Sequence, residues 1–302
     1  MVLTMKKINT LIKDMYEVYD PEHKGWDVNV SHFFTESMKE ISDTRFRLPP
    51  RERGKLSFSQ LGMVCPRKLY LNMNKEEVGE VLDPNVLNKF FYGDMIEVLA
   101  LALAKAAGHS VEGMQDKMEF EGIKGSRDAV IDGMTVDVKS CSSYSFKKFK
   151  EGTLRDNDPF GYISQLSSYV AAGADDPLVT EKTKGAFLVV DKVTGEMWLD
   201  EHDFTIDVLN KKEEIQGIKD MVASPTPPPI IPDVQYMKSS NRTLAMPCVY
   251  CNHKSTCHPK LRAFKSYRGP VYLTKVNKEP RMEELVLNST MDKLKGMKDK
   301  LK

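Results

Sequence analysis

The sequence lacks a long hydrophobic run. No stretch of its 302 residues reaches the roughly 20 consecutive apolar residues that a membrane-spanning helix needs. The N-terminus also lacks the apolar core of a signal peptide, because Lys6, Lys7 and Lys13 interrupt it. These absences argue against an export signal and predict that the protein has no membrane partner.

Net charge and cysteine are also scarce. The 44 basic and 43 acidic residues nearly cancel and leave a net charge of +1, so only local clusters of charge can indicate a nucleic-acid partner. Five cysteines, an odd number, argue against the disulfide framework of a secreted protein, and we expect an intracellular, reducing environment. A chain of this length buries a sizeable core, as one main domain with appendages.

A predicted hairpin around Asp132 and Gly133 is the most informative part of the chain. These two residues are a strong signal for a two-residue loop, and the flanking residues alternate between polar and apolar. That loop sets Asp128 opposite Asp137 and directs Lys139 toward the same face. Two carboxylates at cross-strand distance repel each other unless a cation compensates them, and divalent cations prefer carboxylate oxygens. The alternative is an ordinary solvated hairpin face. The residues predicted to face the core are Ala129, Ile131, Val136 and Val138.

Two helical patterns favour a functional site over a solvated face. Glu97 enters the apolar part of a helix predicted over 85–107, and buried carboxylates are rare unless they are paired or bind metal. Gln165 and Tyr169 share one face of a helix predicted over 161–172, and both side chains can hydrogen-bond a phosphate or a base edge. The alternatives are a solvent-facing stripe for Glu97 and a satisfied helix surface for the other two.

Four of the five cysteines form a metal-binding pattern, with one thiol far upstream of three others. The set is Cys65, Cys248, Cys251 and Cys257. Four thiolates suit either zinc or an iron–sulfur cluster, and His253 or His258 are alternative ligands that favour zinc. Cys141 lies outside the pattern, and we expect it to be a buried or passive thiol.

Two local clusters are candidates for contact with DNA. The first is a basic arm broken by prolines, with Arg45, Arg47, Arg51, Arg53 and Lys55. The second lies in a loop predicted over 141–160 and interleaves Tyr144, Phe146, Lys147, Lys148, Phe149 and Lys150. Interleaving suits a single strand, because bases stack on rings and lysines follow phosphates, so Lys147 and Lys148 are candidate DNA contacts. The alternative is a solvated loop in which Phe146 and Phe149 pack inward.

The chain divides into four predicted parts. They are an N-terminal helical segment with the basic arm over 1–56, a core over 57–223, a proline-rich linker with the cysteine cluster over 224–268, and a C-terminal tail over 269–302, of which residues 279–302 are expected to be charged and amphipathic. Closure of the cysteine cluster onto Cys65 would join the chain's two ends around the core.

Four further elements are predicted inside the core. A short helix capped by Ser57 or Ser59 runs into residues 65–70. Two strands joined by a turn occupy 185–200, and another helix follows over about 204–223. Strands and helices that alternate in this way predict an α/β fold.

These motifs, in this order, resemble those of the RecB-type PD-(D/E)XK nucleases. The matching residues are Gly93, Glu97, Asp128, Asp137, Val138, Lys139, Gln165 and Tyr169. The four cysteines resemble those of the iron–sulfur subset, which includes AddB nuclease domains and CRISPR-adaptation exonucleases. The likeness covers about residues 57–262, and the combination is more specific than any single motif. It implies a restriction-endonuclease-like core, a small mixed sheet flanked by helices, with a cysteine-clamped iron–sulfur C-terminal segment.

The resemblance implies a role for each motif residue. Those expected to bind Mg²⁺ or Mn²⁺ are Glu97, Asp128, Asp137 and the carbonyl of Val138. Lys139 would orient the attacking water, and Gln165 and Tyr169 would position DNA. Those expected to hold a [4Fe–4S] cluster, with zinc as the alternative, are Cys65, Cys248, Cys251 and Cys257.

The chain departs from the family pattern in three places. Many relatives have histidine where this chain has Glu97, which predicts a more carboxylate-rich metal site. The acidic residue of the D-x-K motif is Asp137 where glutamate is commoner, and no proline precedes Asp128. The shorter reach of aspartate predicts an altered metal preference.

The leading functional expectation is a metal-dependent DNA exonuclease in recombination, repair or processing, acting on single strands or free ends. The first alternative is a structure-specific endonuclease on the same fold. The second is a zinc-stapled nucleic-acid-binding protein without catalysis. The expected location is the cytoplasm of a prokaryote or of a virus-infected cell.

Overall fold

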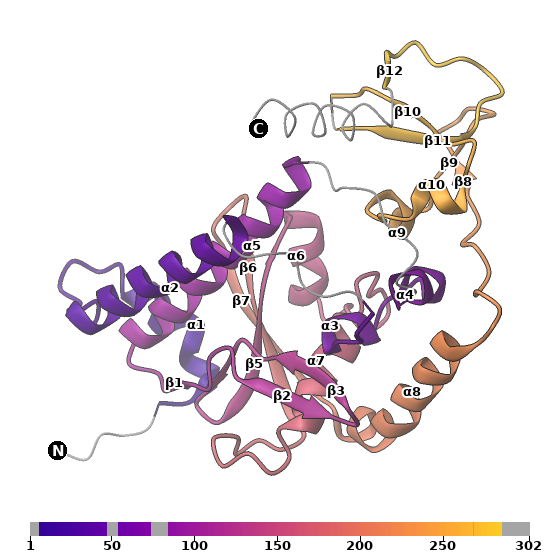
Figure 1. Ribbon diagram of the computed structural model, residues 1–302. Helices are drawn as coiled ribbons and strands as arrows, with labels where there is room; N and C mark the ends of the chain where they lie inside the picture. The colour runs from indigo at the N-terminus through magenta and orange to yellow at the C-terminus, as the bar shows by residue number, and fades with distance from the viewer. Residues whose placement is uncertain (1–5, 47–53, 74–83, 268, 286–302) are drawn as a thin grey trace, which may run out of the picture. The chain divides into compact units, whose positions relative to one another are not determined.

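The computed structural model describes residues 6–46, 54–73, 84–267 and 269–285 (Figure 1). The chain forms two compact units. The first combines Met1–Met63 with Pro84–Asp220, and the second combines Val64–Asp83 with Met221–Lys302. Among the described residues, no helix has the length and apolar character that crossing a membrane requires.

A five-stranded mixed sheet forms the centre of the first unit. In spatial order its strands are β1 (Val111–Glu112), β4 (Ala129–Ile131), β5 (Met134–Cys141), β6 (Lys184–Asp191) and β7 (Met197–Asp203). The pair β5–β6 is parallel, and the other neighbours are antiparallel. A separate hairpin consists of β2 (Lys117–Phe120) and β3 (Ile123–Ser126). The predicted α/β class with a small mixed sheet is therefore confirmed.

The predicted hairpin register is confirmed. Ile131 pairs with Met134, which leaves Asp132 and Gly133 as a two-residue loop between β4 and β5. Both loop residues have positive φ, 48° and 82°, as a type I′ turn requires, and this explains the Asp-Gly sequence. Because the side-chain period of a strand is two, the same register turns Ala129 and its neighbours on that face into the core.

Helices cover both faces of the central sheet (Figure 1). Those of the first unit are η1 (Ile8–Thr10), α1 (Leu11–Glu17), α2 (Val28–Phe46), α3 (Phe58–Leu61), α5 (Pro84–Ala106), α6 (Ser143–Lys150), α7 (Tyr162–Ala172) and α8 (Thr205–Ala223). Along β6, Ala186 and Leu188 pack with α1 and α5, whereas Phe187 and Val189 pack with α6 and α7. The apolar run of β6 thus belongs to a strand buried on both faces.

The predicted apolar helix is α5, which ends before Gly108 as expected. Its second half is almost wholly buried, from Val98 to Ala106, against β5 and the N-terminal helices. The strand pair predicted over 185–200 is β6 and β7, and the helix predicted after it is α8.

Two local predictions were wrong. The loop predicted over 141–160 contains α6, whose buried Phe146 and Phe149 lie three residues apart on one face, a helical spacing that the basic residues obscured. The helix capped by Ser57 does not continue into residues 65–70. It ends at Leu61, and Pro66 begins a separate helix, because proline lacks the N–H that a helix interior needs.

In its described residues, the second unit contains three short helices and an antiparallel sheet. The helices are α4 (Pro66–Met73), α9 (Met246–Val249) and α10 (Lys254–Cys257). The strands, in spatial order, are β12 (Glu284–Leu285), β10 (Arg262–Phe264), β11 (Val271–Lys275), β9 (Arg242–Thr243) and β8 (Val234–Gln235). The predicted C-terminal tail over 269–302 contains β11 and β12, and its residues 286–302 lie outside the described part of the chain.

Candidate active site and cysteine cluster

Asp137 and Lys139 lie two residues apart on β5 and form the centre of the candidate site. Asp137 is 1% exposed, and its Oδ2 atom lies 2.5 Å from Lys139 Nζ. The other carboxylate oxygen of Asp137, Oδ1, is buried and has no hydrogen-bond partner within the described part of the chain. Burial raises the pKa of Asp137, and Lys139 opposes that rise. The carboxylate therefore has a buried oxygen whose negative charge a cation would compensate.

Asp128 reaches across the start of the hairpin, as the predicted register requires. Its Oδ2 atom accepts a hydrogen bond of 2.7 Å from the backbone N–H of Val138. Burial, and then the neighbouring Asp137 and Glu97, hold the pKa of Asp128 well above its usual range. The predicted cross-strand repulsion between the two aspartates is therefore present in the fold.

Glu97 on α5 belongs to the same group of charges. It is half-buried, and its Oε1 atom accepts a hydrogen bond of 2.7 Å from Nε2 of Gln115. Burial, followed by the charge of Asp137, raises the pKa of Glu97 to about 7. Glu97 thus lies among the acidic residues and not on an exposed stripe of the helix.

We predict that the metal-free protein loses stability as pH rises through the titration of Glu97. Burial raises the pKa of Glu97 from its ordinary value of 4.5 to about 7 in the folded protein. Between these values the folded state holds more protons than the unfolded state, so the free energy of unfolding falls with rising pH. Thermal unfolding in a chelator, from about pH 5 to about pH 8, should show the parent losing stability relative to Glu97→Gln. A constant difference between parent and variant would contradict the prediction.

Lys139 is held by three groups. Besides Asp137, its Nζ atom donates to Oε1 of Gln165 at 3.3 Å and lies 4.9 Å from the ring centroid of Tyr162. Burial alone would disfavour the ammonium, but Asp137 and Asp128 outweigh it and raise the pKa of Lys139. Lys139 therefore stays protonated in a mostly enclosed position.

The helix α7 supplies both predicted DNA-positioning residues, and they lie differently. Gln165 faces Lys139, whereas Tyr169 is 4% exposed and packs edge-to-face on Phe58, with ring centroids 5.3 Å apart. Burial raises the pKa of Tyr169 to about 12. The ring of Tyr169 is part of the core in this arrangement and is not accessible for stacking on a base.

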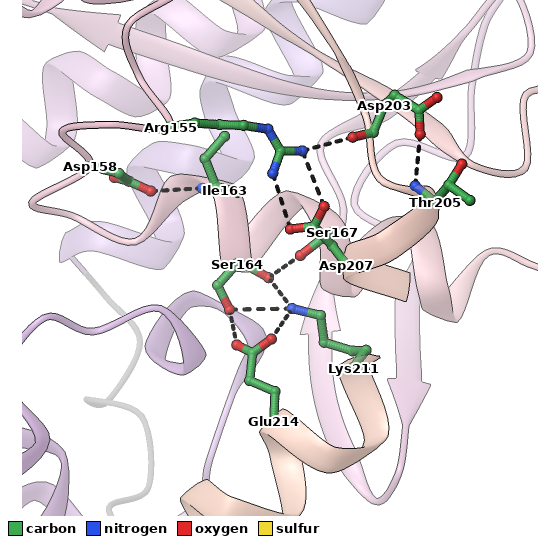
Figure 2. Close-up of polar contacts among 10 residues, drawn as sticks. All are labelled: Arg155, Asp158, Ile163, Ser164, Ser167, Asp203, Thr205, Asp207, Lys211 and Glu214. Carbon is green, nitrogen blue, oxygen red and sulfur yellow. Dashed lines mark hydrogen bonds and ion pairs between the residues drawn. The ribbon is translucent and has the colours of Figure 1, made fainter. Parts of the chain in front are cut away.

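A polar network fixes α7 from the side of α8 (Figure 2). The buried Lys211 on α8 donates to the carbonyl of Ser164 at 3.3 Å and pairs with Glu214 at 2.6 Å, and Ser164 also bonds Glu214. At the start of the helix, Asp158 accepts a hydrogen bond of 2.8 Å from the N–H of Ile163. Since Ser164 precedes Gln165, these contacts set where Gln165 meets Lys139.

Sequence reasoning missed two residues of the site, Gln115 and Tyr162. Gln115 lies in the loop after β1 with a positive φ of 56°, and its backbone N–H donates to the carbonyl of Asp128 at 3.4 Å. No sequence signal marks this loop. Tyr162 lies three residues before Gln165, a spacing that places the two on one helix face and that a search around Gln165 would have found.

The predicted basic clusters are only partly available for DNA. On α6, Phe146 and Phe149 are buried, so the inward-packing alternative holds for both rings. Lys147 pairs with Glu151 at 3.5 Å, and Lys148 donates to the carbonyl of Asn157 at 3.1 Å. Of the predicted arm, Arg45 lies on α2 and pairs with Asp94, while Arg47, Arg51 and Arg53 lie outside the described residues.

The second unit brings the four predicted cysteines to one cavity. They line it from α4, α9, α10 and the segments beside them: Cys65, Cys248, Cys251 and Cys257. All four are free thiols. Backbone N–H groups point at two of the sulfurs, from Lys68 to Cys65 and from His253 to Cys251, each at 3.4 Å. Such N–H donors stabilise negative charge on sulfur.

The alternative ligands also line this cavity. His253 directs Nε2 to Oδ1 of Asn72 at 2.9 Å, and burial lowers the pKa of His258. Burial, with the three neighbouring thiols, raises the pKa of Cys248 to about 11. Cys141 belongs to the first unit, where burial raises its pKa to about 12, as expected of a passive thiol.

Neither set of residues is arranged as a finished metal site. Over residues 6–46, 54–73, 84–267 and 269–285, no group of three or more His, Cys, Asp or Glu side chains has the geometry to hold an ion. In the acidic site, the ammonium of Lys139 lies against Asp137.

Comparisons with known proteins leave the family open. No family model and no curated protein matches this chain. One solved structure that matches, the crystal structure of SSO0001, is 13% identical over 76% of this chain and 96% of its own, with a TM-score of 0.38. A likeness at that score supports no argument about fold or function.

Proposed function

We propose that this chain is a metal-dependent DNA exonuclease of the RecB-type PD-(D/E)XK class. The observation that supports it most directly is the pairing of the half-buried Asp128 with the buried Asp137, brought together by the hairpin with Lys139 beside them. Like charges cost free energy when they are buried together, and a fold retains such an arrangement where a cation or a reaction uses it. Hydrolysis of a phosphodiester uses such a cation, because negative charge on the attacking and leaving oxygens has to be neutralised.

The donor set of the acidic site fits Mg²⁺ or Mn²⁺. The residues that would hold the ion are Glu97, Asp128, Asp137 and the carbonyl of Val138, all oxygen donors. Added positive charge would be stabilising here, because Oδ1 of Asp137 has no hydrogen-bond partner among the described residues and the pKa values of Asp128 and Glu97 are raised. When bound, the ion neutralises charge on the attacking and leaving oxygens of the phosphodiester.

The side chains around the ion would have separate tasks. Lys139 remains an ammonium, so it can donate a hydrogen bond to a water or to a phosphate oxygen. Gln165 and Tyr162 hold that ammonium in place from α7. The N–H of Val138 fixes the carboxylate of Asp128 before substrate arrives.

We further propose that the four cysteines hold a [4Fe–4S] cluster with a structural role. Four free thiols around one cavity, two of them receiving N–H donors, suit thiolate-bound iron, and zinc is the alternative for the same donor set. A metal held by Cys65 and the downstream cysteines would close a long loop and stabilise the second unit.

The form of the cluster is tested by anaerobic purification with iron and zinc analysis and a visible spectrum. We expect a brown protein with a broad absorption band near roughly 400 nm, which arises from thiolate-bound iron–sulfur clusters. A colourless protein with stoichiometric zinc would instead support the zinc alternative and would remove the cluster from the proposal.

The activity is tested with linear and circular single-stranded DNA of one sequence, with and without Mg²⁺ or Mn²⁺. We expect nucleotide release from the linear strand only, and only with added metal, because an exonuclease needs an end. Cleavage of the circle would support the endonuclease alternative. Binding without cleavage under every condition would support the non-catalytic alternative.

A further inference from the structure

Three aromatic rings form a column beside the candidate active site. Phe149 and Tyr162 stack with centroids 6.2 Å apart and an interplanar angle of 27°, and Tyr162 and Phe160 stack at 5.4 Å and 26°. Phe149 is 1% exposed, whereas Phe160 is 45% exposed. The column therefore starts in the core and ends at the surface, and its middle ring contacts the ammonium of Lys139.

The loop that presents Phe160 is fixed by hydrogen bonds. Oδ1 of Asp158 accepts from the N–H of Gly161 at 2.9 Å and from that of Phe160 at 3.3 Å. Upstream, Arg155 donates to the carbonyl of Asp203 at 2.7 Å and pairs with Asp207 at 3.1 Å (Figure 2). An exposed apolar ring on an anchored loop loses little conformational entropy when it binds a partner.

A lysine and a second exposed ring adjoin this loop. Lys148 on α6 donates to the carbonyl of Asn157 at 3.1 Å and lies 5.6 Å from the ring centroid of Tyr144, which is 75% exposed. Its neighbours Lys147 and Lys150 pair with Glu151 and Glu196. A lysine ammonium has three N–H donors, so the carbonyl of Asn157 leaves Lys148 the capacity to bind an anion.

We infer that Phe160 is a stacking platform for a base of an unpaired DNA strand, with Lys148 binding the adjoining backbone phosphate. Rings and lysines in alternation are the chemistry of single-strand binding, whereas the bases of a duplex are already stacked on one another. Tyr162 joins the platform to Lys139, so a strand bound on Phe160 is led to the acidic residues. Delivery of the strand to the acidic residues rests on the proposed function, whereas binding of the strand to Phe160 and Lys148 does not.

The platform is tested by binding with cleavage switched off. A fluorescent single-stranded oligonucleotide is titrated with the full chain carrying Asp137→Asn, alone or with Phe160→Ala, Phe160→Leu or Phe160→Trp. We expect about tenfold weaker binding for the alanine and leucine variants, a typical loss for one base–aromatic stack, and near-parent binding for tryptophan. Tyr19→Ala serves as the control, because Tyr19 is an exposed aromatic residue of the same unit, in the segment after α1.

The stack itself is observed with 2-aminopurine in the strand. Its fluorescence should be quenched on binding by the parent and by Phe160→Trp, and not by Phe160→Leu. Equal affinity and equal quenching for parent and Phe160→Leu would overturn the inference, as would a parent that binds duplex as tightly as single strand. Binding that depends on Phe160 in a protein that cleaves nothing would refute the proposed nuclease and leave the platform standing. Metal-dependent cleavage that Phe160→Leu leaves unchanged would refute the platform and leave the proposed nuclease standing.

Discussion

The Asp137→Asn variant is expected to cleave DNA about 10²- to 10³-fold more slowly than the parent at saturating Mg²⁺, because charge stabilisation by a bound ion contributes several kcal/mol to such reactions. Asp137 is a buried carboxylate with one oxygen that has no hydrogen-bond partner among the residues that the structure describes, and asparagine keeps its shape while removing the charge. The same loss is expected of Lys139→Ala. The measurement is nucleotide release from linear single-stranded DNA.

The matched control is Asp200→Asn, a nearly buried carboxylate on β7 of the same sheet that pairs with His202 at 2.8 Å. If a general loss of buried charge caused the effect, the control would lose activity equally. Circular dichroism and thermal unfolding establish that each variant is folded. Normal turnover by purified, folded Asp137→Asn would rule out the nuclease assignment.

The second large effect is expected from Cys251→Ala, which should lose its bound metal and unfold at a Tm lower by about 10 °C or more, since bound metal contributes directly to folding. Cys251 is a buried member of the four-cysteine cavity, and its sulfur accepts the N–H of His253. Metal content by elemental analysis and unfolding by calorimetry measure the two losses.

Cys141→Ala is the control for the cysteine prediction, because Cys141 is also a buried free thiol but belongs to the first unit. It should keep the parent's metal content. A Cys251→Ala protein as heat-stable and as metal-replete as the parent would show that the thiols have no structural metal, and the cysteine cluster would then be an ordinary set of core residues.

The sequence by itself determined the elements whose signals are local. The Asp132-Gly133 turn set the register of β4 and β5, because few residues tolerate the positive φ that a two-residue hairpin loop requires. The apolar run of α5 predicted the helix, and Gly108 after it predicted where the helix ends. The opposition of Asp128 and Asp137 follows from the hairpin alone, so the central pair of the site was predictable.

Only the tertiary structure decided which side chains surround that pair. Gln115 meets Glu97 through a contact between segments that have no shared periodicity in the sequence, and the contact of Tyr162 with Lys139 joins α7 to β5. Burial likewise separated Tyr169, which packs into the core, from Phe160, which reaches the surface. Such assignments depend on how sheets and helices pack, and packing is a sum of long-range contacts that no local pattern records.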